Sequence, residues 1–421
     1  MKAKKITAAL LTAALSAGLF SACSSGEAAA DAAKTNTKEN PTVNTYTPNY
    51  DNVKPLGRAY LNDDDTLWLA FSGSGAEFTF NGKKAVVTIA GDDNAEKANN
   101  EDNQARIAIY VNGERVIDDM VDKAEETYTV FESDTAADCD VKIVKLSETA
   151  MSTCAIKSIE VDSETGIKPA PAKSHSIEFI GDSITCGYGV DDEDRDHHFS
   201  TKTEDVTKAY AYKTAEALDA DYSMVSISGY GIISGYSGDG KKIPVQTIPQ
   251  YYTKVGFSYG TYGGKAPAAT KWDFSRYQPE VVVINLGTND DSYTLTDEEK
   301  QMEYCNAYVD LIKKVRENNP DAKIFCTLGI MGDRLFDYVQ LAAYNYTQET
   351  GDDNIATMKF DVQLAEDGWA ADWHPTDATH TKASEKLAAE IKEVMGWYNT
   401  KYEKMQTDTV KTYAVTVCFF I

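Results

Sequence analysis

The sequence predicts an α/β domain, a parallel sheet between two layers of helices, preceded by an all-β sandwich of jelly-roll kind. Between about residues 53 and 161 the apolar residues come in short alternating runs, rich in β-branched and aromatic residues, as is typical of antiparallel strands. After residue 173 uninterrupted apolar runs alternate with amphipathic stretches, which indicates buried parallel strands joined by helices. With 421 residues the chain is long enough for two such domains.

Residues 1–22 have the order of an export signal. Lysines near the start are followed by an apolar stretch over 6–20 and by the small residues Ser21 and Ala22. The apolar stretch is too short to span a membrane. Cys23 after two small residues resembles a bacterial lipobox, which implies cleavage before Cys23 and a diacylglycerol on its sulfur. The alternative is an ordinary signal peptide with a chance cysteine, which would give a secreted protein.

Residues 23–52 are mainly Ala, Ser, Thr, Asn and Pro, and are expected to form a flexible tether. The β domain is expected over 53–167. Asn81-Gly82 and Asn112-Gly113 separate apolar runs, and each pair predicts a hairpin turn because both turn positions need positive φ. The expected strands are 66–71, 76–80, 85–89, 106–111, 128–131, 141–146 and 155–161.

A stiff Pro-Ala linker over 168–173 leads into the second domain, which is expected over 174–400. The tail over 401–421 interrupts the α/β pattern, and no role is predicted for it. Strands are expected at 176–180, 222–227, 281–286 and 323–328, with helices at 210–218, 298–318 and 382–398.

Composition narrows the possible partners and cofactors. A formal charge of −25 disfavours binding to nucleic acid or to anionic lipid headgroups. The cysteines form no CxxC pair and lie at no ligand spacing from a histidine, so neither a metal nor another cofactor is predicted. Cys139 and Cys154 could form a disulfide, which the sequence leaves open.

The chemistry is expected at the carboxyl edge of the parallel sheet. Gly181-Asp182-Ser183 ends the first strand, where small residues allow a sharp turn that presents a hydroxyl at the ligand-binding edge. Gly229 ends the second strand and Asn289 the third, and both can donate to an oxyanion. His374 follows Asp372 shortly before the last helix. Each motif alone could be a turn or a cap, but the four in this order indicate a serine hydrolase.

On these motifs the segment from Ser176 to Trp397 resembles the SGNH (GDSL) hydrolase superfamily. The resemblance implies that Ser183 is the nucleophile and that its amide, the Gly229 amide and Asn289 form the oxyanion hole. It also implies that His374 is the general base and Asp372 its orienting acid. Asp372 precedes His374 by two residues instead of the usual three, so a backbone carbonyl could orient His374 instead.

The β domain and the Asp-Trp-His-Pro sequence ending at Pro375 look most like the second carbohydrate esterase family. That resemblance implies removal of acetyl groups from a plant polysaccharide, xylan or mannan. Trp373 is expected at the mouth of the site, where its bulk leaves little room for a long acyl chain. His380 is a second candidate base, because Asp377 precedes it by the usual spacing, but Pro375 holds His374 in an extended loop and favours His374.

Two other functions remain open. The same site could serve a lipase-like or thioesterase activity on longer acyl chains. Alternatively, the chain could be a non-catalytic surface lipoprotein that binds glycans. The intact Ser183, Asn289 and His374 argue against the second alternative. The expected partner is an acetylated polysaccharide or oligosaccharide, and contact with a membrane is expected only through a lipid on Cys23.

Overall fold

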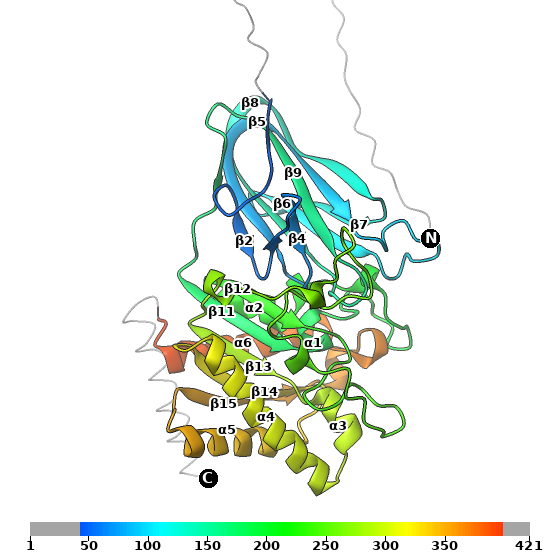
Figure 1. Ribbon diagram of the computed structural model, residues 1–421, viewed down its shortest axis with the longest axis vertical. Coiled ribbons are helices and arrows are strands. Elements are labelled where there is room, and N and C mark those ends of the chain that lie inside the picture. The colour runs from blue at the N-terminus through cyan, green and yellow to red at the C-terminus, as the bar shows by residue number, and fades with distance from the viewer. Residues whose placement is uncertain (1–42, 399–421) are drawn as a thin grey trace, which may run out of the picture. The chain divides into compact units, whose positions relative to one another are not determined.

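The computed structural model describes residues 43–398. The predicted signal peptide, Cys23 and the 401–421 tail lie outside the described residues. Within them the two predicted folds are both present: an antiparallel β domain and then a parallel sheet flanked by helices (Figure 1). None of the helices in the described part of the chain is long and apolar enough to cross a membrane.

All ten strands of the β domain are hydrogen-bonded into one antiparallel sheet. Seven of them follow the order β3-β4-β9-β5-β8-β6-β7, while β1 pairs with β9 and both β2 and β10 pair with β5. The long strands β5 and β8 bend, so that one half of each belongs to each layer of a sandwich. A single apolar core fills the space between the layers. The strands are β1 (Val43–Tyr46), β2 (Lys54–Leu56), β3 (Tyr60–Leu61), β4 (Leu67–Leu69), β5 (Gly75–Gly91), β6 (Ala105–Val111), β7 (Glu114–Val121), β8 (Glu125–Lys145), β9 (Cys154–Asp162) and β10 (Ile167–Pro169).

One of the two predicted hairpins is present and the other is not. Asn112 and Gly113 have φ values of 52° and 83° and join β6 to β7, as predicted. Asn81 and Gly82 instead lie inside β5, next to a register shift in its pairing with β8. A Cβ on Gly82 would lie 2.0 Å from the Asp162 carbonyl oxygen. This glycine therefore permits close approach of two strands, which the sequence signal does not distinguish from a turn.

The predicted tether and linker are both too long. Val43–Tyr46 form β1, which pairs with β9, so the end of the predicted 23–52 tether belongs to the β domain. Lys168 and Pro169 belong to β10, which pairs with β5, and so are part of the sheet instead of a linker. Backbone pairing, which composition does not report, fixes both segments.

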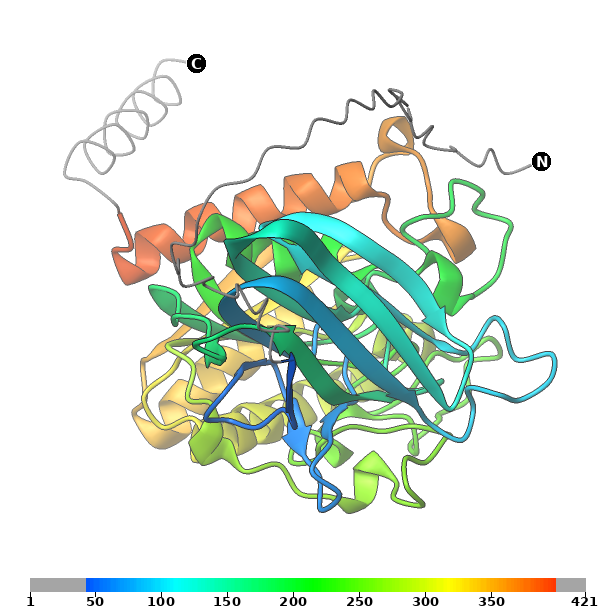
Figure 2. The same ribbon diagram turned by 90° about the horizontal axis from the view of Figure 1, so that it is seen from above.

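The second domain has a five-stranded parallel sheet with the order β12-β11-β13-β14-β15. Helices α2 and α6 pack on one face and α4 and α5 on the other, which gives the predicted three layers. In Figure 2 the orange-red α6 lies on the opposite side of the molecule from the yellow to orange helices α4 and α5. Helix α6 starts before the predicted residue 382, because Thr376 caps it by accepting the Thr379 amide. The elements are β11 (His175–Gly181), α1 (Ser183–Cys186), α2 (Tyr210–Ala217), β12 (Ala220–Ser226), β13 (Val281–Asn285), α3 (Thr288–Thr294), α4 (Glu298–Asn318), β14 (Lys323–Ile330), α5 (Phe336–Thr350), β15 (Ile355–Val362) and α6 (Asp377–Met395).

The two domains share buried polar and apolar contacts. Arg58 of the β domain is fully buried and pairs with Glu178 of β11 at 3.1 Å. Ser223 and Tyr252 also donate to the Glu178 carboxylate, so this buried charge is well satisfied. Leu146 and other apolar residues of the β domain belong to the same core as α2 and α6. The β domain is thus built into the core of the α/β domain.

Candidate active site

Ser183 lies at the point where the strand order of the parallel sheet reverses, between β11 and β13. It is the first residue of α1, and the Asp182 side chain caps that helix by accepting the Ile184 amide at 3.1 Å. The glycine at 181 is required, because a Cβ there would lie 2.0 Å from Thr185 Oγ1. Within the described residues the Ser183 amide has no hydrogen-bond partner, as expected at a helix start, so it is free to bind an anion.

His374 reaches Ser183 from the segment before α6. Its Nε2 lies 2.9 Å from Ser183 Oγ, and its Nδ1 lies 3.1 Å from the Ala371 carbonyl oxygen. Because a carbonyl can only accept, Nδ1 must carry the proton and Nε2 is left as the acceptor for the serine hydroxyl. Burial lowers the pKa of His374 to about 4, so the ring is neutral at pH 7. The pair therefore has the protonation state that a general base requires.

Asp372 does not make its predicted contact with His374. Its carboxylate accepts the Tyr188 hydroxyl at 2.5 Å and contacts His198 Nδ1 at 2.9 Å. Burial acts against ionisation, but these two hydrogen bonds hold the pKa of Asp372 below its usual value. The Ala371 carbonyl occupies the position predicted for the acid, which is the arrangement that the short spacing left open.

The backbone explains this exchange of partners. Asp372 and Trp373 both have positive φ, 49° and 64°, a region that non-glycine residues enter at a cost of about 1 kcal/mol or more each. These two left-handed residues turn the chain so that the Ala371 carbonyl faces the His374 ring while Asp372 points to Tyr188. Strain of this kind persists where the surrounding contacts determine the geometry, and it is common at functional sites.

Tyr188 is a site residue that the sequence motifs do not identify. Its ring stacks on the His374 ring, with centroids 3.9 Å apart and planes 19° apart, and its hydroxyl is bound by Asp372. It follows Gly187, which caps α1 at a φ of 80°. An aromatic residue after the glycine that ends the nucleophile helix was the available signal. Tyr188 fixes the plane of the His374 ring through packing.

The Gly229 amide has no hydrogen-bond partner within the described residues. In the segment from Ser228 to Tyr236 all backbone N–H groups except that of Gly229 have a hydrogen-bond partner. Asp290 alone accepts three of these amides, from residues 232–234. Gly229 has a φ of 78°, and a Cβ there would meet no atom within 4 Å. The loop is thus held tightly around one free donor, which is what an oxyanion hole requires.

Asn289 lies at the start of α3, after β13, and is nearly fully buried. Its amide nitrogen donates to Asp182 Oδ2 at 3.2 Å and to the Tyr230 carbonyl at 3.0 Å. Both amide hydrogens are therefore engaged, and an oxyanion would share or replace the longer bond to Asp182. Burial raises the pKa of Asp182 to about 7. The structure brings Asn289 to the site, but through partners that the motif did not predict.

Trp373 is exposed over 48% of its surface, as expected of a residue at the mouth of a site. The Arg195 guanidinium lies over its ring at 4.2 Å from the centroid, and the Trp369 ring is 5.8 Å away. The acidic segment that carries Arg195 and His198 therefore lies against Trp373 and Asp372.

The rival pair Asp377 and His380 is placed elsewhere. His380 lies inside α6, fully buried, and its Nδ1 accepts the Tyr210 amide at 3.1 Å. Asp377 is exposed and pairs with Lys213 at 2.6 Å. Because α6 begins at Asp377, both residues belong to that helix and not to the segment that carries His374.

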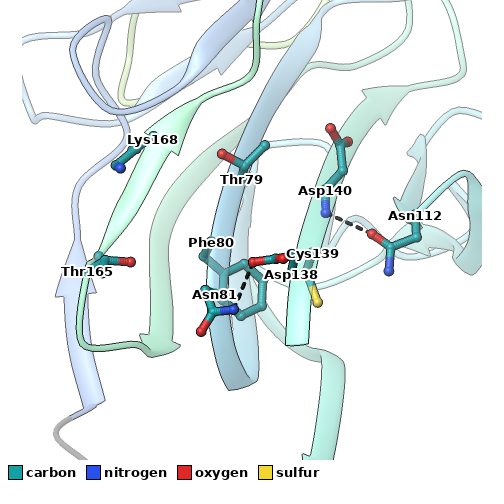
Figure 3. Close-up of a pocket in the computed structure, with 10 residues that line it drawn as sticks. Thr79, Phe80, Asn81, Asn112, Asp138, Cys139, Asp140, Thr165 and Lys168 are labelled. Carbon is teal, nitrogen blue, oxygen red and sulfur yellow. Dashed lines mark hydrogen bonds between the residues drawn. The ribbon is translucent and has the colours of Figure 1, made fainter. Parts of the chain in front are cut away.

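A separate hollow lies on the β domain, along β5, β8 and β10 (Figure 3). Its lining contains no residue of the Ser183 site. Polar residues dominate it, and Asn81 is bonded to Asp138 there at 2.7 Å. Cys139 lines its floor and, like Cys154, is a free buried thiol, so the disulfide that the sequence left open is not formed.

Two family models match the chain, one for each domain. Residues 179–382 match the GDSL-like lipase/acylhydrolase family. Residues 56–171 match the N-terminal domain of the second carbohydrate esterase family. The two matches follow the domain division seen in the structure. The carbohydrate esterase match begins at the end of β2, and the GDSL-like match begins within β11.

Curated and solved proteins resemble the chain over most of its length. It is 33% identical to the cellulase/esterase CelE of Acetivibrio thermocellus over 84% of this chain but only 41% of that protein. It is 26% identical to an acetylxylan esterase/glucomannan deacetylase of Cellvibrio japonicus, covering 82% of this chain and 89% of the other. A family two carbohydrate esterase from Clostridium thermocellum, solved in complex with cellohexaose, is 31% identical with a TM-score of 0.70. That match covers 82% of this chain and all of the solved chain.

Proposed function

The chain belongs to the second family of carbohydrate esterases, and we propose that it removes acetyl groups from plant cell-wall polysaccharide, either xylan or mannan. As a member of that family it is a carboxylic ester hydrolase with a GDSL-type catalytic domain. The single observation that carries the proposal is the 2.9 Å contact between Ser183 Oγ and the unprotonated nitrogen of His374, beside the exposed Trp373.

In the proposed reaction Ser183 Oγ attacks the acetyl carbonyl as His374 Nε2 takes the hydroxyl proton. The Ser183 and Gly229 amides and the Asn289 side chain bind the oxyanion that forms on the carbonyl oxygen. The ester bond to the sugar then breaks, and His374 returns its proton to the departing sugar oxygen. Water repeats the sequence on the acetyl-enzyme and releases acetate. The Ala371 carbonyl keeps Nδ1 protonated throughout, so no carboxylate needs to contact the ring.

The choice of a sugar acetate over a longer acyl ester rests on the mouth of the site. Trp373, with Arg195 and Trp369 packed against it, offers an apolar ring face next to the catalytic histidine. Such a face suits the apolar side of a sugar ring, whereas its bulk restricts the space for an acyl chain. Two of the relatives are described as an acetylxylan esterase/glucomannan deacetylase and as a complex with cellohexaose, which supports a β-linked polysaccharide as substrate.

The test is acetate release from acetylated xylan and acetylated glucomannan, measured beside 4-nitrophenyl acetate and 4-nitrophenyl octanoate. We expect release from at least one polysaccharide, and hydrolysis of the acetate ester much faster than of the octanoate. Trp373→Ala is the informative variant, because it should impair the polysaccharide reaction more than that of the small acetate. Equal turnover of octanoate and acetate would favour the lipase-like alternative. Binding of polysaccharide with no turnover of any ester would favour the non-catalytic one.

We further propose that the protein is exported and anchored to the cell surface through a lipid on Cys23. The support is the order of the first residues, in which a basic start and an apolar stretch precede Ser21-Ala22-Cys23. Labelling with a fatty-acid analogue in a bacterial host should mark the wild-type protein and not Cys23→Ala. An unlabelled wild-type protein in the medium would indicate simple secretion.

A further inference from the structure

Two glutamates lie close together between the domains, next to residues 228–236, the loop that carries Gly229 and is called the oxyanion loop below. Glu148 belongs to the connection between β8 and β9 of the β domain, and Glu204 to the segment before α2. Both side chains are fully buried. Glu148 Oε2 accepts the Ser228 amide at 2.8 Å, and the Glu148 amide donates to Glu204 Oε2 at 2.7 Å. A chain of two hydrogen bonds therefore connects Glu204 with the residue next to Gly229.

Each carboxyl group also keeps one oxygen, Oε1, buried and without a hydrogen-bond partner. Two unpaired carboxylate oxygens in one buried cluster would be very costly if both groups were ionised. The charged and titratable groups that act on the pair are the buried Lys145, Arg106 and the Cys186 thiol. Burial raises the pKa of both carboxyl groups, most strongly that of Glu204. One carboxylate oxygen of each glutamate and the Cys186 Sγ atom lie within 4.8 Å of one another, so a proton or a divalent metal ion between the two carboxyl groups would relieve their repulsion.

We propose that Glu148 is a positioning residue for the oxyanion hole, held in place by the hydrogen bond that its own amide donates to the Glu204 carboxyl group. This inference rests on the proposed esterase function and assigns to the β domain a part in the reaction. Glu148 touches neither substrate nor reacting atoms, and it acts through the Ser228 amide.

The geometry explains how Glu148 would act. The donor N–H of Gly229 belongs to the peptide between Ser228 and Gly229, so rotation about the bonds of Ser228 changes its direction. Anchoring the Ser228 amide on one side restricts that rotation, while the Gly229 carbonyl accepts the Tyr236 amide at 2.8 Å on the other. A flexible glycine between two anchored points keeps its N–H pointing one way. Removal of the Glu148 anchor should leave the loop in place but with a less defined donor.

Three substitutions of Glu148 separate positioning from charge. Glu148→Gln keeps an oxygen for the Ser228 amide and supplies an NH₂ for Glu204, so kcat for 4-nitrophenyl acetate should stay within about threefold of wild type. Glu148→Asp keeps the charge but is one methylene too short for Ser228, and should lower kcat at least about tenfold. Glu148→Ala should lower kcat by about 30- to 100-fold with KM changed less than about threefold, which approaches the loss of one oxyanion donor.

Glu178→Gln is the matched control. It removes the charge of another buried carboxylate between the domains and so weakens the ion pair of Glu178 with Arg58. This pair does not contact the oxyanion loop, so the variant should have a lower melting temperature with little change in kcat. If Glu178→Gln and Glu148→Ala reduce kcat alike, Glu148 has only a general structural role and the proposal fails. The proposal also fails if Glu148→Asp is as active as wild type, or if Glu148→Gln is as impaired as Glu148→Ala.

A measurement without turnover keeps this inference distinct from the proposed function. Hydrogen exchange of the amides over 228–236 should accelerate in Glu148→Ala and Glu148→Asp and remain as in wild type in Glu148→Gln and Glu204→Gln. An inactive wild-type protein would reject the esterase proposal but leave this prediction testable. Elemental analysis of the purified protein completes the test, because Glu148, Glu204 and Cys186 could together hold a metal ion. One equivalent of divalent metal, lost in Glu204→Gln, would assign Glu148 to a metal site and overturn the proposal.

Discussion

Ser183 and His374, the proposed nucleophile and base, are held in place by different means. Ser183 stands at the end of the buried strand β11, on a helix start whose cap and glycine lie within two residues of it. His374 is carried by an irregular segment with two successive left-handed residues, and its ring is held by Tyr188 and the Ala371 carbonyl. The nucleophile depends on the sheet and its local sequence, whereas the base depends on contacts from distant parts of the chain.

The difference predicts how each residue responds to mutation. Changes near Ser183 should act through chemistry, because the sheet fixes the backbone there whatever the side chain. Changes near His374 should act through orientation, because several weak contacts together determine one ring position. A shift of about 1 Å in a catalytic group is enough to lower a rate a hundredfold.

Ser183→Ala should have the largest effect. We expect hydrolysis of 4-nitrophenyl acetate to fall at least about 10⁴-fold, because the acyl-enzyme cannot form and only oxyanion and binding effects remain. The melting temperature should stay near that of wild type, since β11 and α1 do not depend on the hydroxyl. Near-normal turnover by a well-folded Ser183→Ala protein would reject the role of Ser183.

His374→Ala should come next, with a loss of about 10³- to 10⁴-fold in kcat, by the usual scale for a triad base. His380→Gln is the control, because it keeps an acceptor for the Tyr210 amide inside α6 and should cost about tenfold or less. Folded proteins must be compared, since His380 is buried. The opposite ranking of the two variants would transfer the role to His380 and Asp377.

The same contrast between local and distant contacts explains which features could be predicted from the sequence. The strands, the nucleophile turn and Gly229 were predictable because the residues that form each lie together in the chain, as at Gly181-Asp182-Ser183. The partner of His374 was not predictable, since it depends on two left-handed residues that carry no glycine signal. The hairpin predicted at Asn81-Gly82 is absent for a related reason. The glycine accommodates the Asp162 carbonyl of another strand, and the local sequence cannot show that contact.

Tyr188 tests whether packing or hydrogen bonding holds the base. Tyr188→Phe keeps the stacked ring and loses only the bond to Asp372, so kcat should remain within about threefold of wild type. Tyr188→Ala removes the ring from His374 and should lower kcat by about 10- to 100-fold. If Tyr188→Phe is as impaired as Tyr188→Ala, the link to Asp372, and not the stacking, orients His374.

Asp372→Asn should have the smallest effect on rate and a specific effect on pH dependence. Since the Ala371 carbonyl fixes the Nδ1 proton, kcat near pH 8 should fall about tenfold or less, in contrast to the 10⁴-fold loss of an enzyme whose acid holds the histidine. Because burial lowers the pKa of His374 to about 4, the acid limb of kcat/KM should lie near pH 4 in the wild type.

The sign of the shift in Asp372→Asn follows from the charge that is removed. The Asp372 carboxylate favours the protonated ring and so raises the pKa of His374, against the larger effect of burial. Its loss lets that pKa fall further, and the acid limb should move to lower pH. Asp182, with a pKa of about 7, is unchanged in both proteins, so its contribution cancels when the two profiles are compared. A limb that moved upward, or a 10³-fold loss at every pH, would mean that Asp372 orients His374 during the reaction. The base would then depend on a carboxylate after all, and the contrast with Ser183 would narrow.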